Sequence, residues 1–341
     1  MSALDRVLVA RTDKLGDFML TWPALALLRA ALPKARIDLL VASAVEEIAC
    51  ACPYIDRVVV DRGQALKSIA AEVREPRYEA AVALFVTGRV GMTLLAARVP
   101  YRLGPATKAA QVCFNHRLVQ RRSRSDQPEH AYNSDLIRRL LGDFDLTVPP
   151  EPHPPYLAFA RDTLETVRSA LCARYAVAAE ARLIVVHPGS GGSANNLSTE
   201  QYAGLANALA SSEPLQILVT AGPGERAQAA ALAGQITAHR AVVHDSCDGL
   251  LAFARVLALA DVFISGSTGP LHIAGALDIR TAAFYPRRRS STALRWQTTN
   301  SPARRLAFSP PAAAAETDMS AIDIQAAAAE INAGFLHDLQ R

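Results

Sequence analysis

Two kinds of hydrophobic pattern alternate along this chain. Short runs of consecutive aliphatic residues, typical of strands buried on both faces, are followed by stretches in which apolar residues recur every three or four positions, as on one face of a helix. In the first part of the chain these runs predict strands over residues 6–10, 37–42, 57–60 and 80–86. Strands that alternate with helices indicate parallel βαβ units, and therefore a doubly wound α/β sheet.

A proline-rich segment divides the pattern into two halves. Five prolines lie between Val148 and Tyr156, which predicts a stiff linker and a domain boundary. After this segment the alternation restarts, with strands expected over residues 183–187, 216–220, 262–264 and 281–284 and near 242. We therefore expect one doubly wound domain over 1–150, a second over 156–310 with a cleft between the two, and a C-terminal helix over 318–341 that packs back on the N-terminal domain.

Composition describes a globular protein and removes several other classes. Half of the 341 residues are hydrophobic and a fifth are charged, which excludes a disordered chain, and the net charge is only +4. The most apolar run, residues 250–264, is interrupted by Arg255 and Asp261 and is too short to span a bilayer. The beginning of the chain lacks the apolar core of a signal peptide. We expect a cytoplasmic protein, and contact with a membrane surface stays open.

The five cysteines are scattered along the chain. Cys50 and Cys52 have no second pair and no nearby histidine cluster that would complete a zinc site. Reduced thiols and no metal site are therefore expected.

The stretch from Asp261 to Leu277, DVFISGSTGPLHIAGAL, combines a short strand, a glycine-rich turn and a helical pattern. This order places backbone N–H groups at a helix N-terminus, where an anionic group, typically a phosphate, is favoured. Gly266 and Gly269 let the backbone come close to such a group, and Thr268 offers a hydroxyl. The alternative is an ordinary turn between a strand and a helix.

Two further groups of polar residues lie before the proline-rich segment. Asp13, Lys14 and Asp17 follow the first expected strand, at the end where doubly wound sheets bind ligands. Residues 101–133 carry a run of arginines that includes Arg121, Arg122 and Arg124. This run predicts either a solvated loop or a docking surface for an acidic or phosphorylated partner. Nucleic acid fits less well, because no aromatic residues interleave the arginines and no recognition motif is visible.

Several motifs, in order along nearly the whole chain, resemble glycosyltransferase family 9, the lipopolysaccharide heptosyltransferases. The first is a strand followed by Gly16-Asp17 and an apolar helix with Thr21 and Pro23. The second is VVHPGSGGSANNLSTEQYAGLANAL, and the third is the stretch described above followed by TAAFYP. The segment DMSAIDIQAAAAEI is similar to the closing helix of the family.

The resemblance implies a GT-B fold with two Rossmann-like domains, the first binding the acceptor and the second binding a nucleotide-sugar. It implies inverting, metal-independent transfer of a heptose from ADP-heptose to the Kdo/heptose-lipid core of a lipopolysaccharide at the inner membrane, without any further cofactor. It also assigns the general base to Asp17, which would take the proton of the acceptor hydroxyl. The alternative for Asp17 is a helix cap, and its place at a helix N-terminus is expected to keep it ionised.

The remaining site residues also follow from the resemblance. Those expected to bind the donor are His187, Gly189, Ser190, Asn195, Glu225, Ser267, Thr268, Gly269 and His272. A core histidine is the alternative for His272, and a surface residue that opens a helix is the alternative for Glu225. The acceptor is expected to contact Asp13, Lys14, Arg121, Arg122 and Arg124, because arginine forks suit phosphate and carboxylate groups.

Two positions depart from the family pattern. Ser267 stands where the family usually has Asp before Thr-Gly, and Asn195-Asn196-Leu197 stands where many members have Lys before a basic-Trp pair. A cation is thus missing where the donor phosphate is expected, and Arg287–Arg289 either replace it or form a solvated loop. A transferase for another nucleotide-sugar and a catalytically idle nucleotide-sugar-binding module stay open as alternatives; an epimerase on the same fold fits the motif order less well.

Overall fold

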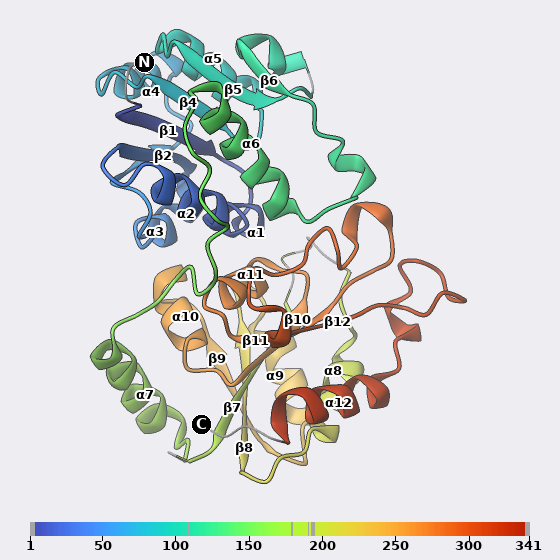
Figure 1. Ribbon diagram of the computed structural model, residues 1–341. Coiled ribbons are helices and arrows are strands. Elements are labelled where there is room, and N and C mark those ends of the chain that lie inside the picture. Colours follow the sequence, from blue (N-terminus) through green and yellow to red (C-terminus); the bar gives the residue numbers. More distant parts are fainter. Residues whose placement is uncertain (1–3, 108, 179, 190, 192–194, 338–341) are drawn as a thin grey trace. The chain divides into compact units, whose positions relative to one another are not determined.

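The computed structural model of the chain describes residues 4–107, 109–178, 180–189, 191 and 195–337. It divides into two compact units, Met1–Tyr156 and Leu157–Arg341, so the division falls at the end of the proline-rich segment. Each unit is built on its own sheet of parallel strands with helices between them (Figure 1).

The first unit has a six-stranded sheet in the order β3-β2-β1-β4-β5-β6, with every neighbouring pair parallel. Its strands are β1 (Arg6–Arg11), β2 (Arg36–Ala42), β3 (Arg57–Asp61), β4 (Ala80–Ala83), β5 (Tyr101–Pro105) and β6 (His116–Leu118). Its α-helices are α1 (Leu15–Met19), α2 (Trp22–Ala31), α3 (Glu46–Ala49), α4 (Leu66–Arg74), α5 (Gly88–Ala96) and α6 (Glu129–Asp143). Single 3₁₀ turns are η1 (Ser43–Val45), η2 (Ala109–Cys113) and η3 (Arg122–Arg124).

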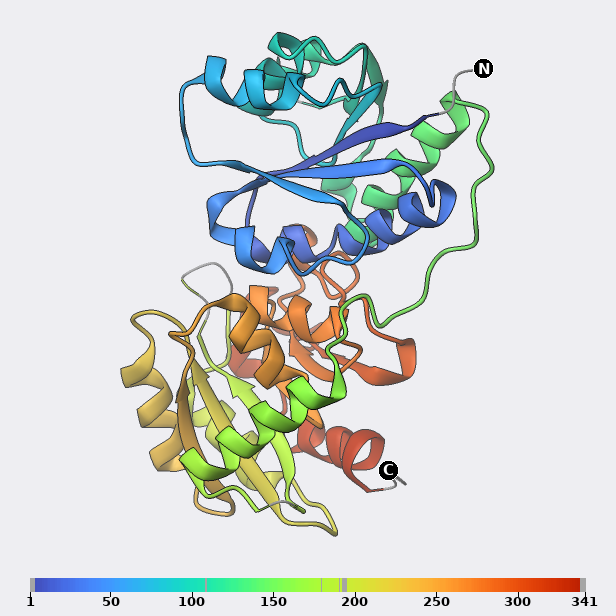
Figure 2. The same cartoon turned by 90° about the vertical axis from the view of Figure 1, so that its left-hand side faces the viewer.

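Burial explains why β1 lies at the centre of this sheet. Its residues from Val7 to Arg11 are all buried, since helices cover both of its faces. Helices α4 and α5 lie over one face and α2 and α6 over the other (Figure 2). Leu8 and Ala10 belong to the core cluster beneath α4 and α5, and a large apolar side chain such as that of Leu8 contributes about 1.5–3 kcal/mol when fully buried.

The apolar helix expected after the first strand is divided in the structure. Helix α1 ends at Met19 and α2 starts at Trp22. Between them the Thr21 hydroxyl donates to the carbonyl of Phe18 at 2.6 Å, and Pro23 occupies the first turn of α2, where a missing N–H is tolerated. Asp17 therefore lies on a short helix of its own.

The second unit repeats the same topology. Its sheet order is β12-β11-β10-β7-β8-β9, again with parallel neighbours. The strands are β7 (Arg182–His187), β8 (Leu215–Ala221), β9 (Arg240–Asp245), β10 (Val262–Gly266), β11 (Arg280–Phe284) and β12 (Arg305–Phe308). The α-helices are α7 (Arg161–Tyr175), α8 (Thr199–Ala208), α9 (Arg226–Gln235), α10 (Leu250–Leu257), α11 (Gly269–Ala276) and α12 (Ile324–Ile331). Shorter turns are η4 (Arg289–Ser291), η5 (Pro302–Arg304), η6 (Met319–Ala321) and the π-turn η7 (Asn332–Leu336).

Both sheets have the strand order of the Rossmann fold. Counted within its own unit, each sheet reads 3-2-1-4-5-6, and the order reverses between the first and the fourth strand. Two such units in one chain confirm the two doubly wound domains that the sequence predicted. In open sheets of this type ligands bind outside the carboxyl ends of the strands at this reversal, which here lies between β1 and β4 and between β7 and β10.

The C-terminal helix packs within the second unit, which differs from the expectation that it returns to the N-terminal domain. Its buried residues Ala327, Ala328 and Ile331 belong to the core cluster that also holds Tyr202 and Leu205 of α8. The backbone N–H of Ala210 also donates to Asn332, at 2.9 Å. The apolar face of α12 is thus buried against α8.

Three edge or near-edge strands, β5, β6 and β12, were not expected from the sequence. Each has at most five residues and contains Arg, Pro or Gly, so it gives no consecutive apolar run. No helix within the described ranges is both long and apolar enough to cross a membrane.

Candidate active site

The turn after β1 gathers two carboxylates around one buried guanidinium. Arg11, the last residue of β1, is only 1% exposed. Its Nε donates to Oδ1 of Asp13 at 2.6 Å, and its Nη2 donates to Oδ1 of Asp17 at 2.8 Å. Both aspartates lie at the carboxyl end of β1, beside the reversal of strand order. The structure thus brings together two of the three polar residues predicted there, while Lys14 is exposed.

Helix α6 completes the network around Arg11. Nη1 of Arg11 donates to Oδ1 of Asn133 at 3.1 Å and lies 3.5 Å from Oε1 of Glu129, whose side chain is 2% exposed. The amide of Asn133 in turn donates to the carbonyl of Leu20 at 2.9 Å. Arg11 therefore ties the turn that carries Asp17 to α6, and loss of a charged partner inside such a network leaves another charge uncompensated.

Burial makes Asp17 an unusual carboxyl group. Removal from solvent raises the pKa of Asp17 from 3.8 to about 6, and the charges of Asp13 and Glu129 add to the rise, while Arg11 opposes it. Desolvation thus outweighs the helix N-terminus in setting the pKa of Asp17, although a pKa of about 6 still leaves most of the group ionised at neutral pH, as expected. Asp17 does not cap α1: the N-cap residue is Lys14, which makes no side-chain cap bond. A carboxyl group with a pKa near neutrality suits a general base.

The arginine segment separates into one anchored and two exposed side chains. Arg122 pairs with Glu129, and its Nε and Nη2 donate to Oε1 of Gln120 at 3.0 and 2.7 Å. Arg121 and Arg124 are exposed on either side of it. Arg122 is thus part of the network that surrounds Arg11, whereas its two neighbours face solvent.

In the second unit, two loops meet at the end of β7. Nδ1 of His187 shares a 2.9 Å hydrogen bond with Oγ1 of Thr220, and burial lowers the pKa of His187 below its ordinary value, against the opposing charge of Glu225. Glu225 accepts hydrogen bonds from the backbone N–H of Gly191 at 2.9 Å and of Gly222 at 3.1 Å. Its carboxylate thereby joins the turn after β7 to the turn after β8.

Gly189 is required for this junction. A Cβ atom at this position would overlap the carboxylate of Glu225, so no larger residue fits without moving it. Ser190, also predicted to bind the donor, lies outside the described residues.

The turn after β10 has the strand–turn–helix form that the sequence predicted. Thr268 is the N-cap residue of α11, with Gly269 and Pro270 in the first turn. Thr268 is 4% exposed, and its hydroxyl has no hydrogen-bond partner among the described residues. His272 is also buried, one turn into the helix, while Ser267 is only partly buried. A buried hydroxyl at a helix N-terminus, where the first N–H groups have no acceptor within the helix, offers donors to an anionic ligand.

Asn196 was not singled out by the sequence, yet it joins the turns after β7 and β10. Its amide nitrogen donates to the carbonyl of Pro188 at 2.6 Å, and its oxygen accepts from the hydroxyl of Tyr202. A Cβ on Gly266 would come within 2.5 Å of that oxygen. Asn195, the residue that was predicted, is exposed.

Comparison with known proteins decides the family. The family model of glycosyltransferase family 9 (heptosyltransferase) matches residues 68–305. A Haemophilus influenzae protein that carries the provisional name of a glycosyltransferase is 41% identical over 334 residues, 96% of each chain. The chain belongs to glycosyltransferase family 9. It is therefore a glycosyltransferase.

Solved structures share the fold of this glycosyltransferase at low sequence identity. The ADP-heptose lipopolysaccharide heptosyltransferase II of Escherichia coli has a TM-score of 0.78 at 17% identity, with 97% of this chain and 98% of that chain covered. The heptosyltransferase WaaC of Escherichia coli, solved with ADP, has a TM-score of 0.70 at 19% identity, with 96% and 97% covered. A family 9 glycosyltransferase from Veillonella parvula has a TM-score of 0.75 at 16% identity, covering 90% and 86%. At these identities the likeness concerns the fold alone.

The three arginines after β11 of the glycosyltransferase have different environments. Nη2 of Arg287 donates to the carbonyls of Ala312 and Ala314 at 3.2 and 2.7 Å, so this guanidinium holds the loop before η6. Arg288 and Arg289 are exposed. Arg287 thus supports this loop.

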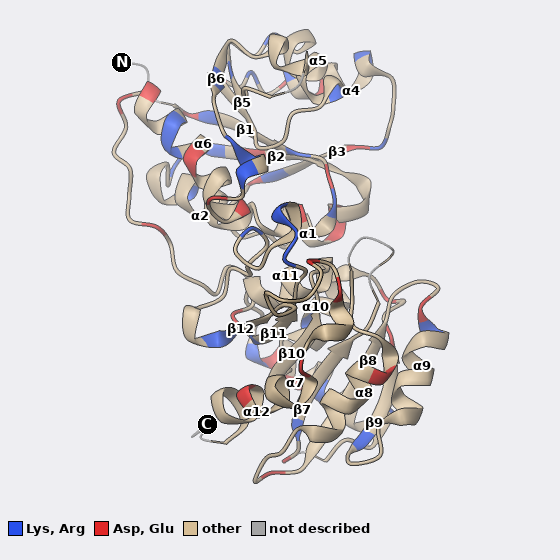
Figure 3. Cartoon of the chain, turned by 90° about the vertical axis from the view of Figure 1, so that its right-hand side faces the viewer, with Lys and Arg blue, Asp and Glu red and all other residues tan. Residues whose placement is uncertain are grey.

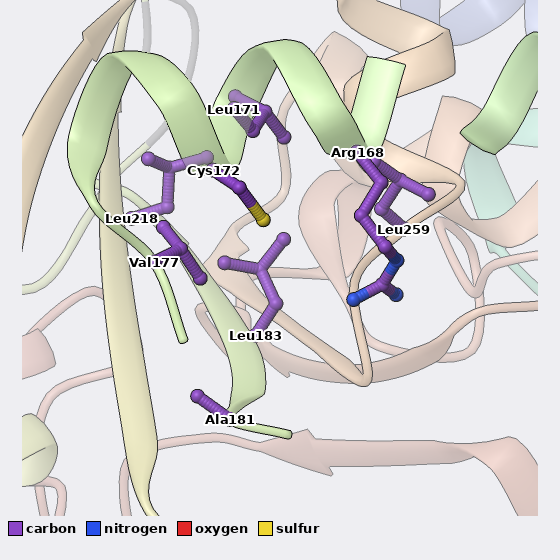
Figure 4. Close-up of a pocket in the computed structure, with 8 residues that line it drawn as sticks. All are labelled: Arg168, Leu171, Cys172, Val177, Ala181, Leu183, Leu218 and Leu259. Carbon is purple, nitrogen blue, oxygen red and sulfur yellow. The ribbon is translucent and has the colours of Figure 1, made fainter. Parts of the chain in front are cut away.

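A small apolar pocket of the glycosyltransferase lies away from all the predicted site residues. It is formed between α7 and the strands β7 and β8, and Figure 4 shows Leu171, Cys172, Leu183 and Leu218 directed into it. Its lining is almost entirely aliphatic, which does not suit a nucleotide-sugar.

Proposed function

We propose that this glycosyltransferase moves a heptose from ADP-heptose to a lipopolysaccharide core acceptor, with inversion at the anomeric carbon and without a metal ion. The acceptor oxygen would form a bond to the anomeric carbon as the bond from that carbon to the ADP phosphate breaks. The acceptor proton would pass to Asp17, and ADP would leave with the bonding electrons.

The observation that carries the proposal is the state of Asp17. Its pKa of about 6 leaves it mostly ionised at neutral pH and still basic enough to accept a proton in the transition state. Oδ1 is held by Arg11, which fixes the carboxylate in one orientation. General base catalysis of this kind contributes about 10²–10⁴-fold in rate.

The turn after β10 is the proposed seat of the leaving group. Negative charge grows on the diphosphate in the transition state, and fixed donors stabilise it without reorganisation. The hydroxyl of Thr268 and the N–H of Gly269 at the N-terminus of α11 are such donors, and His272 lies one turn further on. Glu225 and Gly189 shape the neighbouring turn, where we place the nucleoside. A neighbour of the same fold is solved with ADP, which supports an adenine nucleotide.

The acceptor is proposed to contact the first unit. Lys14, Arg121 and Arg124 are exposed cations, and phosphates and Kdo carboxylates of a core acceptor are anions. Asp13 and Arg122, which the sequence also predicted here, are engaged with Arg11 and Glu129 and are proposed to support the site through those contacts.

A donor other than ADP-heptose is the second candidate. Ser267 stands in place of the usual acid and Asn195 in place of a usual cation, so the sugar and phosphate subsites of this chain differ in charge from the common family pattern. A transferase that prefers another nucleotide-sugar would account for both changes.

One assay separates these possibilities. The protein is incubated with a water-soluble core oligosaccharide and, in parallel, with ADP-heptose, ADP-glucose, UDP-glucose or GDP-mannose, and products are detected by mass spectrometry. Heptose addition that disappears in Asp17→Asn supports the proposal. A hexose product from another donor would replace ADP-heptose, and binding of nucleotide-sugars without product in any combination would contradict transfer altogether.

A further inference from the structure

A chain of alternating charges links the turn after β1 to the arginine segment before α6. Oε1 of Glu129, the first residue of α6, accepts a hydrogen bond from Nη1 of Arg122 and lies 3.5 Å from Nη1 of Arg11. Nη2 of Arg11 donates to Oδ1 of Asp17 at 2.8 Å. One carboxylate oxygen thus stands between two arginines, and one of these arginines holds the proposed base. Figure 3 shows charges of both signs on α6 and beside α1.

The inner part of this chain of charges is shielded from water. The side chains of Arg11 and Glu129 are 1% and 2% exposed, and that of Arg122 is 14% exposed. Charges at such positions interact more strongly than charges on the surface, because less solvent screens them. A change in the surroundings of Arg122 should therefore act on Glu129 and, through Arg11, on Asp17.

The charged groups that act on Asp17 come from β1, from its own turn and from α6. Apart from burial, which raises the pKa of Asp17 most, Arg11 lowers this pKa. Asp13 and Glu129 both raise it. The turn η1, which also packs on α1, carries no titratable side chain. Glu129 differs from Asp13 in that it also pairs with Arg122, on a separate segment of the chain.

Arg122 is the point at which this chain of charges approaches the surface. Its guanidinium lies 5.6 Å from the ring centre of Tyr132, so it packs against α6. In the turn η3 it stands between Arg121 and Arg124, which are exposed and form no ion pair with a described residue. An anion that binds this turn therefore lies close to Arg122 and competes with Glu129 for its guanidinium.

We propose that Arg122 and Glu129 are positioning residues that couple the binding of an anionic acceptor to Asp17. An acceptor phosphate or carboxylate on η3 draws Arg122 away from Glu129, and the negative charge of Glu129 then acts more fully on Arg11. Arg11 in turn stabilises the ionised form of Asp17 less. The base thus becomes stronger when the hydroxyl that it must deprotonate is bound. This inference rests on the proposed function, which supplies the anionic acceptor.

The test follows the side-chain carboxyl carbon of Asp17 by nuclear magnetic resonance as the pH changes. The full chain is labelled with carbon-13 aspartate, and the signal of Asp17 is the one that is absent from Asp17→Asn. Without any ligand, Arg122→Gln should move the titration midpoint to higher pH by about 0.5–1 pH unit, and Glu129→Gln should move it to lower pH by about as much. Arg122→Lys keeps the charge and should stay close to the wild-type midpoint.

Opposite shifts from two neighbouring substitutions are not expected of a purely structural role. A matched control is Arg139→Gln near the other end of α6, where Arg139 pairs with Asp143 at 2.7 Å; it should leave the midpoint of Asp17 unchanged. In the double variant Arg122→Gln, Glu129→Gln the two shifts should nearly cancel. The double variant removes both members of the pair, so it stays informative if Arg122→Gln alone does not fold. Equal midpoints in all variants, or single-variant shifts of one sign, would overturn the proposal.

A second arm adds a water-soluble, phosphorylated core oligosaccharide without any donor, so that no sugar is transferred. At saturation it should raise the wild-type midpoint of Asp17 by about 0.5 pH unit or more, and it should raise that of Arg122→Gln much less. An unchanged wild-type midpoint would overturn the coupling. A rise of equal size in Arg122→Gln would also overturn it, since the ligand would then act on Asp17 directly.

Failure of the proposed function gives a different result. A protein whose midpoint responds as expected, but which forms no heptose product with ADP-heptose, would keep the coupling and refute the proposed transfer. Heptose transfer by a protein whose midpoint does not respond to the oligosaccharide would do the reverse.

Discussion

The guanidinium of Arg11 and the carboxylate of Asp17 lie 2.8 Å apart, and the two residues are joined by one turn of chain at the carboxyl end of β1. Arg11 also reaches Asp13, Glu129 and Asn133, so one buried cation holds a group of carboxylates together. Two effects thus oppose each other at Asp17: burial and its acidic neighbours favour the protonated form, and Arg11 favours the ionised form. The balance places the pKa of Asp17 where a general base is useful.

The pH dependence of transfer should report this balance. If Asp17 is the base, kcat/KM falls about tenfold per pH unit below pH 6, because the base must be ionised to accept a proton. Asp17→Asn should lower kcat by about 10²–10⁴-fold at pH 7–8 and by a smaller factor below pH 6, where the wild-type base is itself protonated, and Asp17→Glu should lower it by less. Initial rates between pH 5 and 8 measure this. If kcat/KM of the wild-type protein does not fall near and below pH 6, Asp17 is not the general base.

The same pKa predicts an unusual effect on stability. Because the folded pKa of Asp17 lies above its ordinary 3.8, its contribution to stability is fully present below about pH 3.8 and is lost as pH rises through about 6. Asn is neutral throughout, so Asp17→Asn should raise the free energy of unfolding at pH 8 by an amount on the order of 2 kcal/mol, and by much less at pH 4. Urea unfolding at both pH values provides the measurement. An equal effect at both would show that ionisation of Asp17 is not its origin.

Substitution of Arg11 should act on both stability and the base. Arg11→Met leaves several buried carboxylates without their cation and should destabilise the first unit by about 3–5 kcal/mol. In whatever fraction stays folded, the acid limb of kcat/KM should move to higher pH, since the group that lowers the pKa of Asp17 is gone. Arg11→Lys keeps the positive charge but loses the branched guanidinium, so the loss of stability and the shift of the acid limb should both be smaller. A variant that is less stable but keeps the wild-type pH profile would limit Arg11 to a structural role.

The sequence predicted the architecture better than it predicted the contacts. Runs of consecutive apolar residues predicted nearly all of the central strands. A strand that is covered by helices on both faces has few polar positions, as β1 and β7 show. The short β6, with an exposed arginine at its centre, has no such pattern. The sequence predicted that the C-terminal helix packs on the N-terminal domain, whereas α12 packs on α8. The apolar face of α12 could pack on any apolar surface of matching shape, and the sequence does not specify which one.

The sequence predicted which turns carry the candidate site, but it did not predict the hydrogen bonds and ion pairs that connect the side chains there. Asp17 and Thr268 were predicted as site residues because each stands in a turn that follows an expected strand. Arg11, Glu129 and Asn196 were missed, although a charged residue that ends a fully apolar run, as Arg11 does, is a usable signal. Their partners are distant in sequence: Arg11 and Asn133 are separated by 122 positions, a pairing that no local pattern encodes.

A single methyl group at Gly189 should disturb the donor side of the site. The added Cβ of Gly189→Ala would occupy the place of the Glu225 carboxylate, which would lose its hydrogen bonds from Gly191 and Gly222. The carboxylate is the far end of a flexible side chain and can move aside, so we expect a loss of only about 1 kcal/mol in stability, from its hydrogen bonds, and a donor KM that rises at least about tenfold. Gly234→Ala in α9, where a Cβ meets nothing within 4 Å, is the matched control and should be neutral or slightly stabilising. Equal behaviour of the two variants would argue against a role for this junction.

Thr268 and Thr281 allow a test that separates donor binding from stability. One substitution should weaken ADP binding without lowering stability, and the other should lower stability without weakening ADP binding. The buried hydroxyl of Thr268 has no partner among the described residues, whereas that of Thr281 accepts from Asn300 at 3.1 Å. Thr268→Val removes a buried polar group without a hydrogen bond, so it should keep or raise the melting temperature of the free protein. If the hydroxyl binds the diphosphate, ADP affinity should fall about tenfold, the loss of one hydrogen bond to a charged group. Thr281→Val should instead lower the melting temperature and leave ADP affinity unchanged. Calorimetric titration with ADP and thermal melting of both variants decide between these outcomes, and an unchanged ADP affinity in Thr268→Val would place the diphosphate elsewhere.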